Sequence, residues 1–203
     1  MKFFPFDAIG RRSAMAVVCA MSLSAGIAMA ADAAAPKVKF ATSEGDFVVE
    51  VYPDKAPKTV ENFLQYVKDQ HYDGTIFHRV IENFMVQGGG YDSAYAEKKT
   101  RAPVVHEGRE ALAKGGAKNV VGTVAMARTN DPNSASSQFF INVKDNDFLN
   151  PSVQAPGYTV FGKVVSGMEI VNKIKATPTG PGGPFPSDAP KTPVVIKSAT
   201  LVN

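Results

Sequence analysis

An arginine lies inside a hydrophobic, strand-like stretch of the chain, where a permanent positive charge is costly unless it has a partner or a chemical task. Arg79 is the third residue of FHRVIENFMVQGGG, and its apolar neighbours include Phe77, Phe84 and Met85. A guanidinium stays protonated and presents a rigid fork of hydrogen-bond donors. Gln87 adds an amide that can bond to a peptide carbonyl. Together these side chains could bind an uncharged group and form hydrogen bonds to the peptide beside it.

Two further segments carry apolar side chains of the same kind. They are GTVAMARTNDPNSASSQFFIN and NDFLN, and they supply Met126, Phe139, Phe140, Phe148 and Leu149. If the three segments converge, they form an apolar floor with the arginine and the glutamine at its rim. Such a site could hold a cyclic side chain while the rim bonds the neighbouring peptide carbonyls. The alternative is that the aromatic residues form the core of a barrel and that Arg79 is a surface ion-pair partner.

The remaining candidates do not support metal or nucleophilic chemistry. The three histidines, His71, His78 and His106, show neither an HxH nor an HExxH spacing, so we expect no metal site. Ser137 stands in SSQFF rather than in a GxSxG turn, which makes a secreted hydrolase a remote alternative. Three glycines at 88–90 lack the Lys-Ser/Thr of a phosphate-binding loop and indicate only a turn or a close backbone approach. We therefore expect no cofactor.

Short strands and two helices are predicted to position these residues. Alternating apolar residues over 37–42 and 47–51 flank a polar turn and predict a β-hairpin. Pro57 begins a helix that ends near Asp69, with its apolar residues on one face. A second, short helix is predicted over Met168–Ile174. The remaining strands are predicted at 75–81, 84–87, 122–127, 138–143, 159–165 and 194–202.

The segment 177–193 is predicted to be a loop, because it contains six prolines and three glycines. The short strands, with helices at two separate places, favour a closed antiparallel barrel whose ends the helices cover. Closure would hide the unpaired edges that so many strands otherwise expose. An open α+β sheet fits the same pattern.

The first 30 residues have the pattern of a secretory signal peptide. Three basic residues precede a mostly apolar segment from Ala14 to Ile27, and Ala28-Met29-Ala30 is a small-x-small cleavage site. We expect cleavage after residue 30, a flexible leader over 31–36 and one domain over 37–203. An uncleaved membrane anchor and a twin-arginine export signal are the alternatives.

Charge and cysteine content exclude several classes of protein. Cys19 is the only cysteine and lies in the predicted signal peptide, so the mature chain would have no disulfide, thiolate metal site or cysteine nucleophile. Three of the 22 Lys and Arg and one of the 19 Asp and Glu also lie there, which leaves a net charge of +1 on the rest. No basic stripe stands out, so we expect no nucleic-acid partner. One short domain without a remaining anchor predicts a monomer that is free of the membrane after cleavage.

Several motifs together resemble the cyclophilins, the cyclosporin-binding family of peptidyl-prolyl cis/trans isomerases. The chain has FHRVI followed by FMVQGGG, then MARTNDPNSASSQFFIN and YTVFGKVVSGM, with APKTVENF before them. These motifs run from about Val38 to Leu201 and are most similar to the secreted, periplasmic bacterial branch. The resemblance implies a mostly β fold, a closed eight-stranded antiparallel barrel capped by two α-helices.

The resemblance also implies roles for ten residues. Arg79 matches the catalytic arginine of the family, and Gln87 matches a glutamine that hydrogen-bonds the substrate backbone. The residues that match the family's proline pocket are Phe84, Met85, Phe140 and Leu149. The residues at the substrate-binding strand edge and at the rim are Ala127, Arg128, Phe148 and Tyr158.

The implied reaction is rotation about the bond before proline in unfolded or exported proteins. Amide resonance gives a barrier of about 18–20 kcal/mol, and uncatalysed rotation takes roughly tens to hundreds of seconds. An arginine that donates to the proline nitrogen favours the twisted, non-resonant amide, which is transition-state stabilisation by a preorganised charge. Arg79 favours catalysis over the alternative, a non-catalytic peptide-binding or holdase module on the same fold.

Some positions depart from the family's pattern. Glu82-Asn83 replace the common Pro-Gly between the first two motifs, and Arg128 stands where the family often has Asn. Phe148 stands where many eukaryotic members carry a tryptophan whose indole N–H helps to hold cyclosporin. We therefore expect weak cyclosporin binding with isomerase activity retained. Tyr158 stands where many members carry a histidine, and its ring can still pack on proline.

Overall fold

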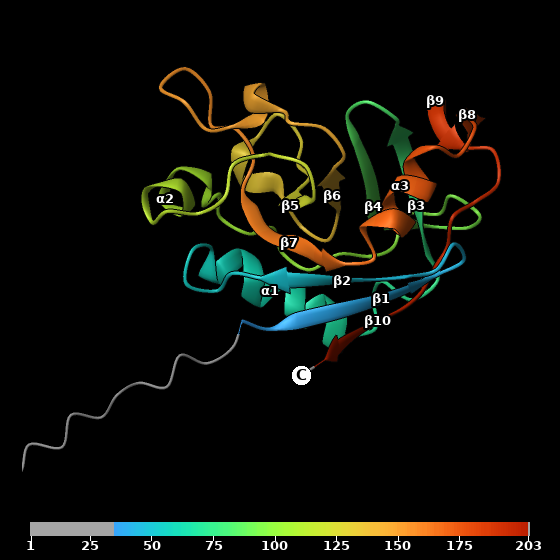
Figure 1. Cartoon of the computed structure of the whole chain (residues 1–203), viewed down its shortest axis with the longest axis horizontal. Helices are drawn as coiled ribbons and strands as arrows, with labels where there is room; N and C mark the ends of the chain where they lie inside the picture. Colours follow the sequence, from blue (N-terminus) through green and yellow to red (C-terminus); the bar gives the residue numbers. More distant parts are fainter. Residues whose placement is uncertain (1–34, 203) are drawn as a thin grey trace, which may run out of the picture. The chain divides into compact units, whose positions relative to one another are not determined.

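The computed structural model describes residues 35–202, and most of their regular secondary structure is β-strand. The predicted signal peptide and residues 31–34 of the predicted leader lie outside this part, so cleavage after Ala30 stays a prediction. Eight strands form one antiparallel sheet in the order β10-β1-β2-β7-β5-β6-β4-β3 (Figure 1). Their bounds are β1 Lys37–Thr42, β2 Asp46–Val51, β3 Thr75–Ile81, β4 Met85–Asp92, β5 Thr123–Met126, β6 Phe139–Asn142, β7 Val160–Ser166 and β10 Ile196–Val202.

The two edge strands of this sheet, β3 and β10, meet and close it into a barrel. Ile76 of β3 forms an antiparallel bridge with Val195, just before β10. The Phe77 N–H donates to the main-chain oxygen of Val194 (3.0 Å), and the Gly74 N–H donates to the first residue of β10 (2.8 Å). The predicted closed barrel is therefore confirmed, but a few contacts rather than a full ladder complete the ring.

Alternating apolar residues of the strands fill the inside of this barrel. Phe40, Phe47, Phe77 and Phe139 are each at most 1% exposed, and Phe40 stacks on Phe47 with ring centroids 5.0 Å apart. Two helices add to the same core: α1 (Pro57–Lys68) and α3 (Met168–Lys175). Their buried apolar residues in this core are Val60, Phe63, Tyr66, Val67, Val171 and Ile174. The two predicted helices therefore belong to the core, as the periodicity indicated.

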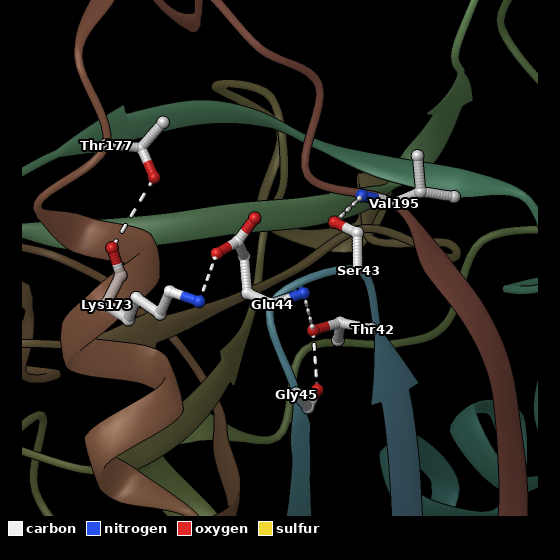
Figure 2. A network of polar contacts seen from close by, with 7 residues as sticks. All are labelled: Thr42, Ser43, Glu44, Gly45, Lys173, Thr177 and Val195. Atoms are coloured by element: carbon white, nitrogen blue, oxygen red, sulfur yellow. Dashed lines mark hydrogen bonds and ion pairs between the residues drawn. The ribbon is translucent and has the colours of Figure 1, made fainter.

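The turn between β1 and β2 connects three parts of the chain (Figure 2). Thr42 Oγ1 accepts a hydrogen bond from the Glu44 N–H (3.1 Å), and the Glu44 carboxylate pairs with Lys173 of α3 (2.9 Å). The Ser43 N–H donates to the Val195 oxygen (2.9 Å), while Ser43 Oγ accepts from the Val195 N–H (3.1 Å). The turn thus holds α3 and the approach to β10 beside each other, near the closure of the barrel.

The segment 177–193 contains a β-hairpin, so the prediction of a loop there was wrong. It forms β8 (Thr179–Gly182) and β9 (Phe185–Pro190), which pair with each other and not with the main sheet. Phe185 stacks on His78 of β3, with ring centroids 5.1 Å apart, and meets Tyr91 edge to face (5.2 Å). Figure 1 shows the hairpin beside β3 and β4. Proline is tolerated here because no further strand needs the missing N–H groups.

A short helix, α2 (Gly108–Ala113), was also not predicted, and two single-turn 3-10 helices occupy Pro132–Ser134 and Asp147–Leu149. Just before α2, the buried carboxylate of Glu107 caps α1 from far along the chain. It accepts hydrogen bonds from the N–H groups of Lys58 (3.1 Å) and Thr59 (2.7 Å) and from the Thr59 hydroxyl (2.7 Å). The residue before α1, Ala56, has no side chain that could satisfy these donors.

Among the residues that the structure describes, no helix is both long enough and apolar enough to cross a bilayer.

Candidate active site

One cavity of about 490 Å³ collects all ten residues that the resemblance singled out. They line it together: Arg79, Phe84, Met85, Gln87, Ala127, Arg128, Phe140, Phe148, Leu149 and Tyr158. Four neighbouring strands deliver the centre of the site, because residues in register lie side by side across the outer face. Arg79 of β3 pairs with Gln87 of β4, Gln87 pairs with Phe140 of β6, and Phe140 pairs with Ala125 of β5.

The apolar floor of the cavity is a small cluster of its own, separate from the barrel interior. Met85, Phe140 and Leu149 are 2%, 4% and 8% exposed, and they pack with Ala125 and Val160. Side chains alternate between the two faces of a strand, so Phe140 points to the cavity while its neighbour Phe139 points into the barrel. The expectation that all the apolar residues of the three segments form the floor was therefore wrong for three of them. These belong to the barrel core: Phe77, Met126 and Phe139.

Arg79 is half-buried at the rim of the cavity. Within residues 35–202 there are five ion pairs, and none includes this arginine. The alternative that Arg79 is a surface ion-pair partner therefore fails for the described chain. Its neighbour His78 is buried, and burial together with the adjacent Arg79 cation lowers the pKa of His78 to about 4. His78 is thus neutral near pH 7 and leaves the arginine as the charged group of its strand.

Gln87 is held in place by a second glutamine. Its Nε2 donates to Oε1 of Gln138 at 3.0 Å. Gln138 in turn lies across the backbone of Gly90, where a Cβ would approach its side chain to 2.6 Å. The glycine run of the first motif therefore includes a position where only glycine leaves room for the side chain that supports Gln87.

Phe84 and Phe148 form one wall of the cavity. Their rings stack with centroids 5.6 Å apart and an interplanar angle of 25°. Phe148 is 73% exposed, the most exposed aromatic ring of the site. An apolar ring in water at a cavity mouth is a ready contact surface for a bound peptide.

Arg128 and Tyr158 form the opposite part of the rim. The Arg128 guanidinium donates twice to the Gly157 oxygen (3.1 and 2.8 Å) and once to the Thr129 oxygen (2.7 Å). It also lies over the Tyr158 ring, 4.5 Å from the centroid, and that ring meets Phe140 edge to face at 5.5 Å. Arg128 thus supports the wall of the cavity with its side chain, a contact that the resemblance did not predict.

A smaller polar hollow of about 240 Å³ adjoins the cavity and shares Gln87, Ala127 and Arg128 with it. Its other lining residues are Glu97, Thr129, Ser134, Ser136 and Gln138. Sequence analysis did not select Gln138, although a signal was present. It stands two residues before Phe140 in SSQFF, and an extended chain places residues two apart on the same face.

None of the described residues gather into groups of three or more His, Cys, Asp or Glu that could hold a metal ion. The His71 ring donates through Nε2–H to the Gly89 oxygen (3.2 Å), and the His106 ring donates through Nε2–H to the Gly157 oxygen (3.2 Å). Burial lowers the pKa of both histidines. Their contacts are those of structural histidines.

Comparisons with known proteins agree with this geometry. A family profile described as cyclophilin type peptidyl-prolyl cis-trans isomerase/CLD matches residues 37–201. The chain belongs to the cyclophilins. It is therefore a peptidyl-prolyl cis-trans isomerase, and the non-catalytic binding module is the less supported alternative.

Two bacterial isomerases illustrate the similarity over nearly the whole length of the relatives. Peptidyl-prolyl cis-trans isomerase B of Escherichia coli is 50% identical over 167 residues, which cover 81% of this chain and 98% of the relative. Peptidyl-prolyl cis-trans isomerase A of Dickeya dadantii is 44% identical over 194 residues, covering 96% and 99%. Among solved structures, a cyclophilin of Cryptosporidium parvum superposes with a TM-score of 0.66 at 26% identity, covering 83% of this chain and 98% of that one.

Proposed function

We propose that this cyclophilin holds a proline ring in the 490 Å³ cavity and directs the guanidinium of Arg79 at the prolyl nitrogen. The observation that carries the proposal is an arginine without an ion pair, among the described residues, at the rim of an apolar floor. A cyclophilin of Cryptosporidium parvum with 26% identity has been crystallised in the presence of the dipeptide Ala-Pro. The proline ring of such a ligand is apolar, as is the floor of the cavity.

The chemistry follows from amide resonance. In the planar amide the nitrogen lone pair is delocalised into the carbonyl and is a poor hydrogen-bond acceptor. As the bond twists, the lone pair returns to the nitrogen, so an N–H of Arg79 bonds the transition state more strongly than the ground state. Lowering the barrier by about 7 kcal/mol corresponds to roughly a 10⁵-fold faster rotation. The step needs no covalent intermediate, because only a rotation separates substrate from product.

The remaining rim residues are proposed to fix the peptide on both sides of proline. Gln87, held by Gln138, presents its amide to a substrate carbonyl. The chain at Ala127 and Arg128 continues β5 and offers main-chain groups to an extended peptide. With the ring seated on Phe140 and Met85, the acyl side of the bond is the part that rotates.

The proposed substrates are X-Pro bonds in unfolded or newly exported proteins, and the proposed location is the periplasm. Support comes from the signal-peptide pattern of the first 30 residues and from the similarity to isomerases A and B of Gram-negative bacteria. The exposed Phe148 ring at the cavity mouth suits extended, unfolded chains. A holdase activity could accompany the isomerase on this surface.

The test compares the cis-to-trans rate of an Ala-Pro-Phe peptide at low temperature for the mature chain and its Arg79→Ala variant. We expect strong acceleration by the wild type and a loss on the order of 10²–10³-fold in kcat/KM for the variant. Arg79→Lys keeps the charge but not the fork of donors, so it should recover only a small part of the activity. Arg101→Ala is the matched control, because Arg101 is a half-exposed arginine that pairs with Asp69 away from the cavity.

A folded Arg79→Ala variant that keeps wild-type activity would remove the arginine from the mechanism. A folded wild type that accelerates no X-Pro peptide would overturn the proposed function as a whole. Circular dichroism of each variant establishes that it is folded.

Cyclosporin binding is expected to be weak, because Phe148 offers a ring but no N–H donor at the cavity mouth. Phe148→Trp adds an indole N–H on a similar ring, and one added hydrogen bond corresponds to an affinity gain of about fivefold. Titration calorimetry measures the dissociation constant of cyclosporin for the wild type and for the Phe148→Trp variant. A nanomolar dissociation constant for the wild type contradicts the expectation.

A further inference from the structure

A chain of three buried asparagines runs behind the wall of the proposed proline cavity. Asn119, Asn142 and Asn146 are 0%, 0% and 2% exposed. None of them lines the cavity, and none has a part in the proposed reaction. Burying three primary amides costs free energy unless each finds hydrogen-bond partners, so their partners indicate what they are for.

The three side chains bond to one another in sequence. Asn146 Nδ2 donates to Oδ1 of Asn142 at 2.8 Å. Asn142 Nδ2 donates to Oδ1 of Asn119 at 3.2 Å and also to the Thr123 hydroxyl at 3.0 Å. Asn142 thus stands in the middle of the chain, accepting from Asn146 and donating to Asn119. Buried polar networks whose members are satisfied make the structure around them more rigid.

Both ends of this amide chain are bonded to main-chain oxygens of cavity residues. At one end, Asn146 Nδ2 donates to the Phe84 oxygen at 3.0 Å. At the other end, Asn119 Nδ2 donates to the Leu149 oxygen at 3.2 Å. The Leu149 oxygen also accepts from the Tyr158 N–H at 2.9 Å, which connects the chain to the rim. Three residues that line the cavity are therefore tied to one buried hydrogen-bonded network.

The two anchored residues lie in separate segments, and the network connects these segments through buried side chains. Phe84 lies at the turn before β4, and Leu149 ends a single 3-10 turn. The Phe84 oxygen also accepts from the N–H of Val143, the residue after β6 (3.1 Å), whereas within the described chain the main chain of Leu149 otherwise bonds only to its own turn and to Tyr158. The main-chain groups of the network add to this: the Asn146 N–H donates to the Asn119 oxygen at 2.8 Å.

We propose that the amide chain Asn119–Asn142–Asn146 sets the spacing between Phe84 and Leu149 and thereby the ring size that the cavity accepts. The proposal rests on the proposed function, because it takes proline as the occupant. The three asparagines are positioning residues: they touch no substrate atom and act through the backbone of the residues that do. Breaking one link lets the wall relax outward, which disfavours a close fit to the five-membered ring and admits a larger one.

The experiment measures isomerisation of three peptides that differ only in the ring of the imino acid. The rings are four-membered azetidine-2-carboxylate, proline and six-membered pipecolate. Asn146→Ala removes the link to Phe84, and Asn119→Ala removes the link to Leu149. In each variant we expect the ratio of kcat/KM for pipecolate to that for proline to rise by about fivefold to tenfold, the size of effect that one lost buried hydrogen bond produces.

The matched control is Thr42→Ala, which also removes a hydrogen bond from a buried side chain to a main-chain oxygen. Thr42 Oγ1 donates to the Gly45 oxygen (2.6 Å) in the turn of Figure 2, and neither residue lines the cavity. General loss of stability lowers the activity on all three rings alike, so this variant should keep the wild-type ratio. Unfolding curves measure the stability of each variant, and the kcat/KM ratios are compared only between variants of similar stability.

Two results overturn the inference: folded asparagine variants with the wild-type ratio, or a control that shifts the ratio as much as they do. If the alanine variants do not fold, Asn146→Ser keeps a hydroxyl in place of the amide and is judged by the same ratio. Failure of the proposed function is a separate outcome, since it appears as a wild type that is inactive on the proline peptide. In that case the ring preference is measured as the ratio of the dissociation constants of the proline and pipecolate peptides.

Discussion

At the scale of single residues, the side chains around the proposed catalytic arginine, Arg79, are held in place by their neighbours. Gln87 is fixed by Gln138, and the Tyr158 ring is covered by Arg128. Arg79 itself has no ion pair within residues 35–202. A preorganised donor is effective because it does not have to break another bond when the substrate twists.

The histidine beside the arginine predicts a dependence of stability on pH. His78 has a pKa of about 4 in the folded chain, lowered first by burial and then by Arg79, against about 6.5 when unfolded. The unfolded chain therefore binds a proton more readily between these values, and stability is lost as pH falls from about 6.5 to 4. The full contribution of this residue is about 3 kcal/mol.

His78→Phe removes the proton site and keeps a ring that can stack on Phe185. We expect the free energy of unfolding of the variant to fall less than that of the wild type between pH 7 and pH 4, by about 3 kcal/mol. Urea unfolding at several pH values measures the difference. His71 and His106 are present in both proteins and give the common background, so equal pH slopes would contradict the prediction.

At the scale of the elements, α1 depends on a residue far from it in sequence. Glu107 supplies the acceptors that the first turn of the helix lacks, and its negative charge lies at the positive end of the helix dipole. Removing the carboxylate leaves buried donors without partners, which is the costly way to lose a hydrogen bond.

Glu107→Ala is expected to destabilise the fold by about 2–3 kcal/mol. Glu61→Ala changes an exposed glutamate on the same helix and should stay within about 0.5 kcal/mol of the wild type. Thermal and urea unfolding measure both variants. A Glu107→Ala protein as stable as the Glu61→Ala protein would show that the cap does not contribute.

The elements also show what could be predicted from sequence. Alternation of apolar and polar residues predicted the strands of the barrel, and helical spacing of apolar residues predicted α1 and α3. Both patterns arise because such an element buries a single face. The β8–β9 hairpin escaped prediction, since its prolines and glycines hide a strand that Phe185 stabilises by packing on His78. The six residues of α2 are too few for a periodic pattern.

The candidate site was predictable from the motifs, but its orientation was not predictable from apolar patterning. Phe139 and Phe140 are adjacent and equally hydrophobic, and a shift of one residue in register would exchange their faces. Only the resemblance to cyclophilins selected Phe140. The asparagine chain was missed because Asn142 and Asn146 give no local signal; their partners Asn119 and Phe84 come from other parts of the chain.

At the scale of the whole described chain, the strands of the barrel differ in how many main-chain hydrogen bonds connect them to their neighbours. β6 pairs with a full neighbour on each side, β4 and β5. β3, which carries Arg79, has a full ladder only with β4, and on its other side it has the Ile76–Val195 bridge and the bonds beside it.

The weakly bonded junction between β3 and the approach to β10, here called the seam, affects how the enzyme loses activity. Local openings begin where few hydrogen bonds must break, so the amides of Gly74 and Phe77 should exchange with deuterium sooner than those of β6. Opening of the seam disturbs the strand that holds the arginine while the rest of the core stays packed. In rising urea, isomerase activity is therefore expected to disappear before the far-ultraviolet circular dichroism changes. Inactivation at the seam would then limit the working range of this cyclophilin before global unfolding does.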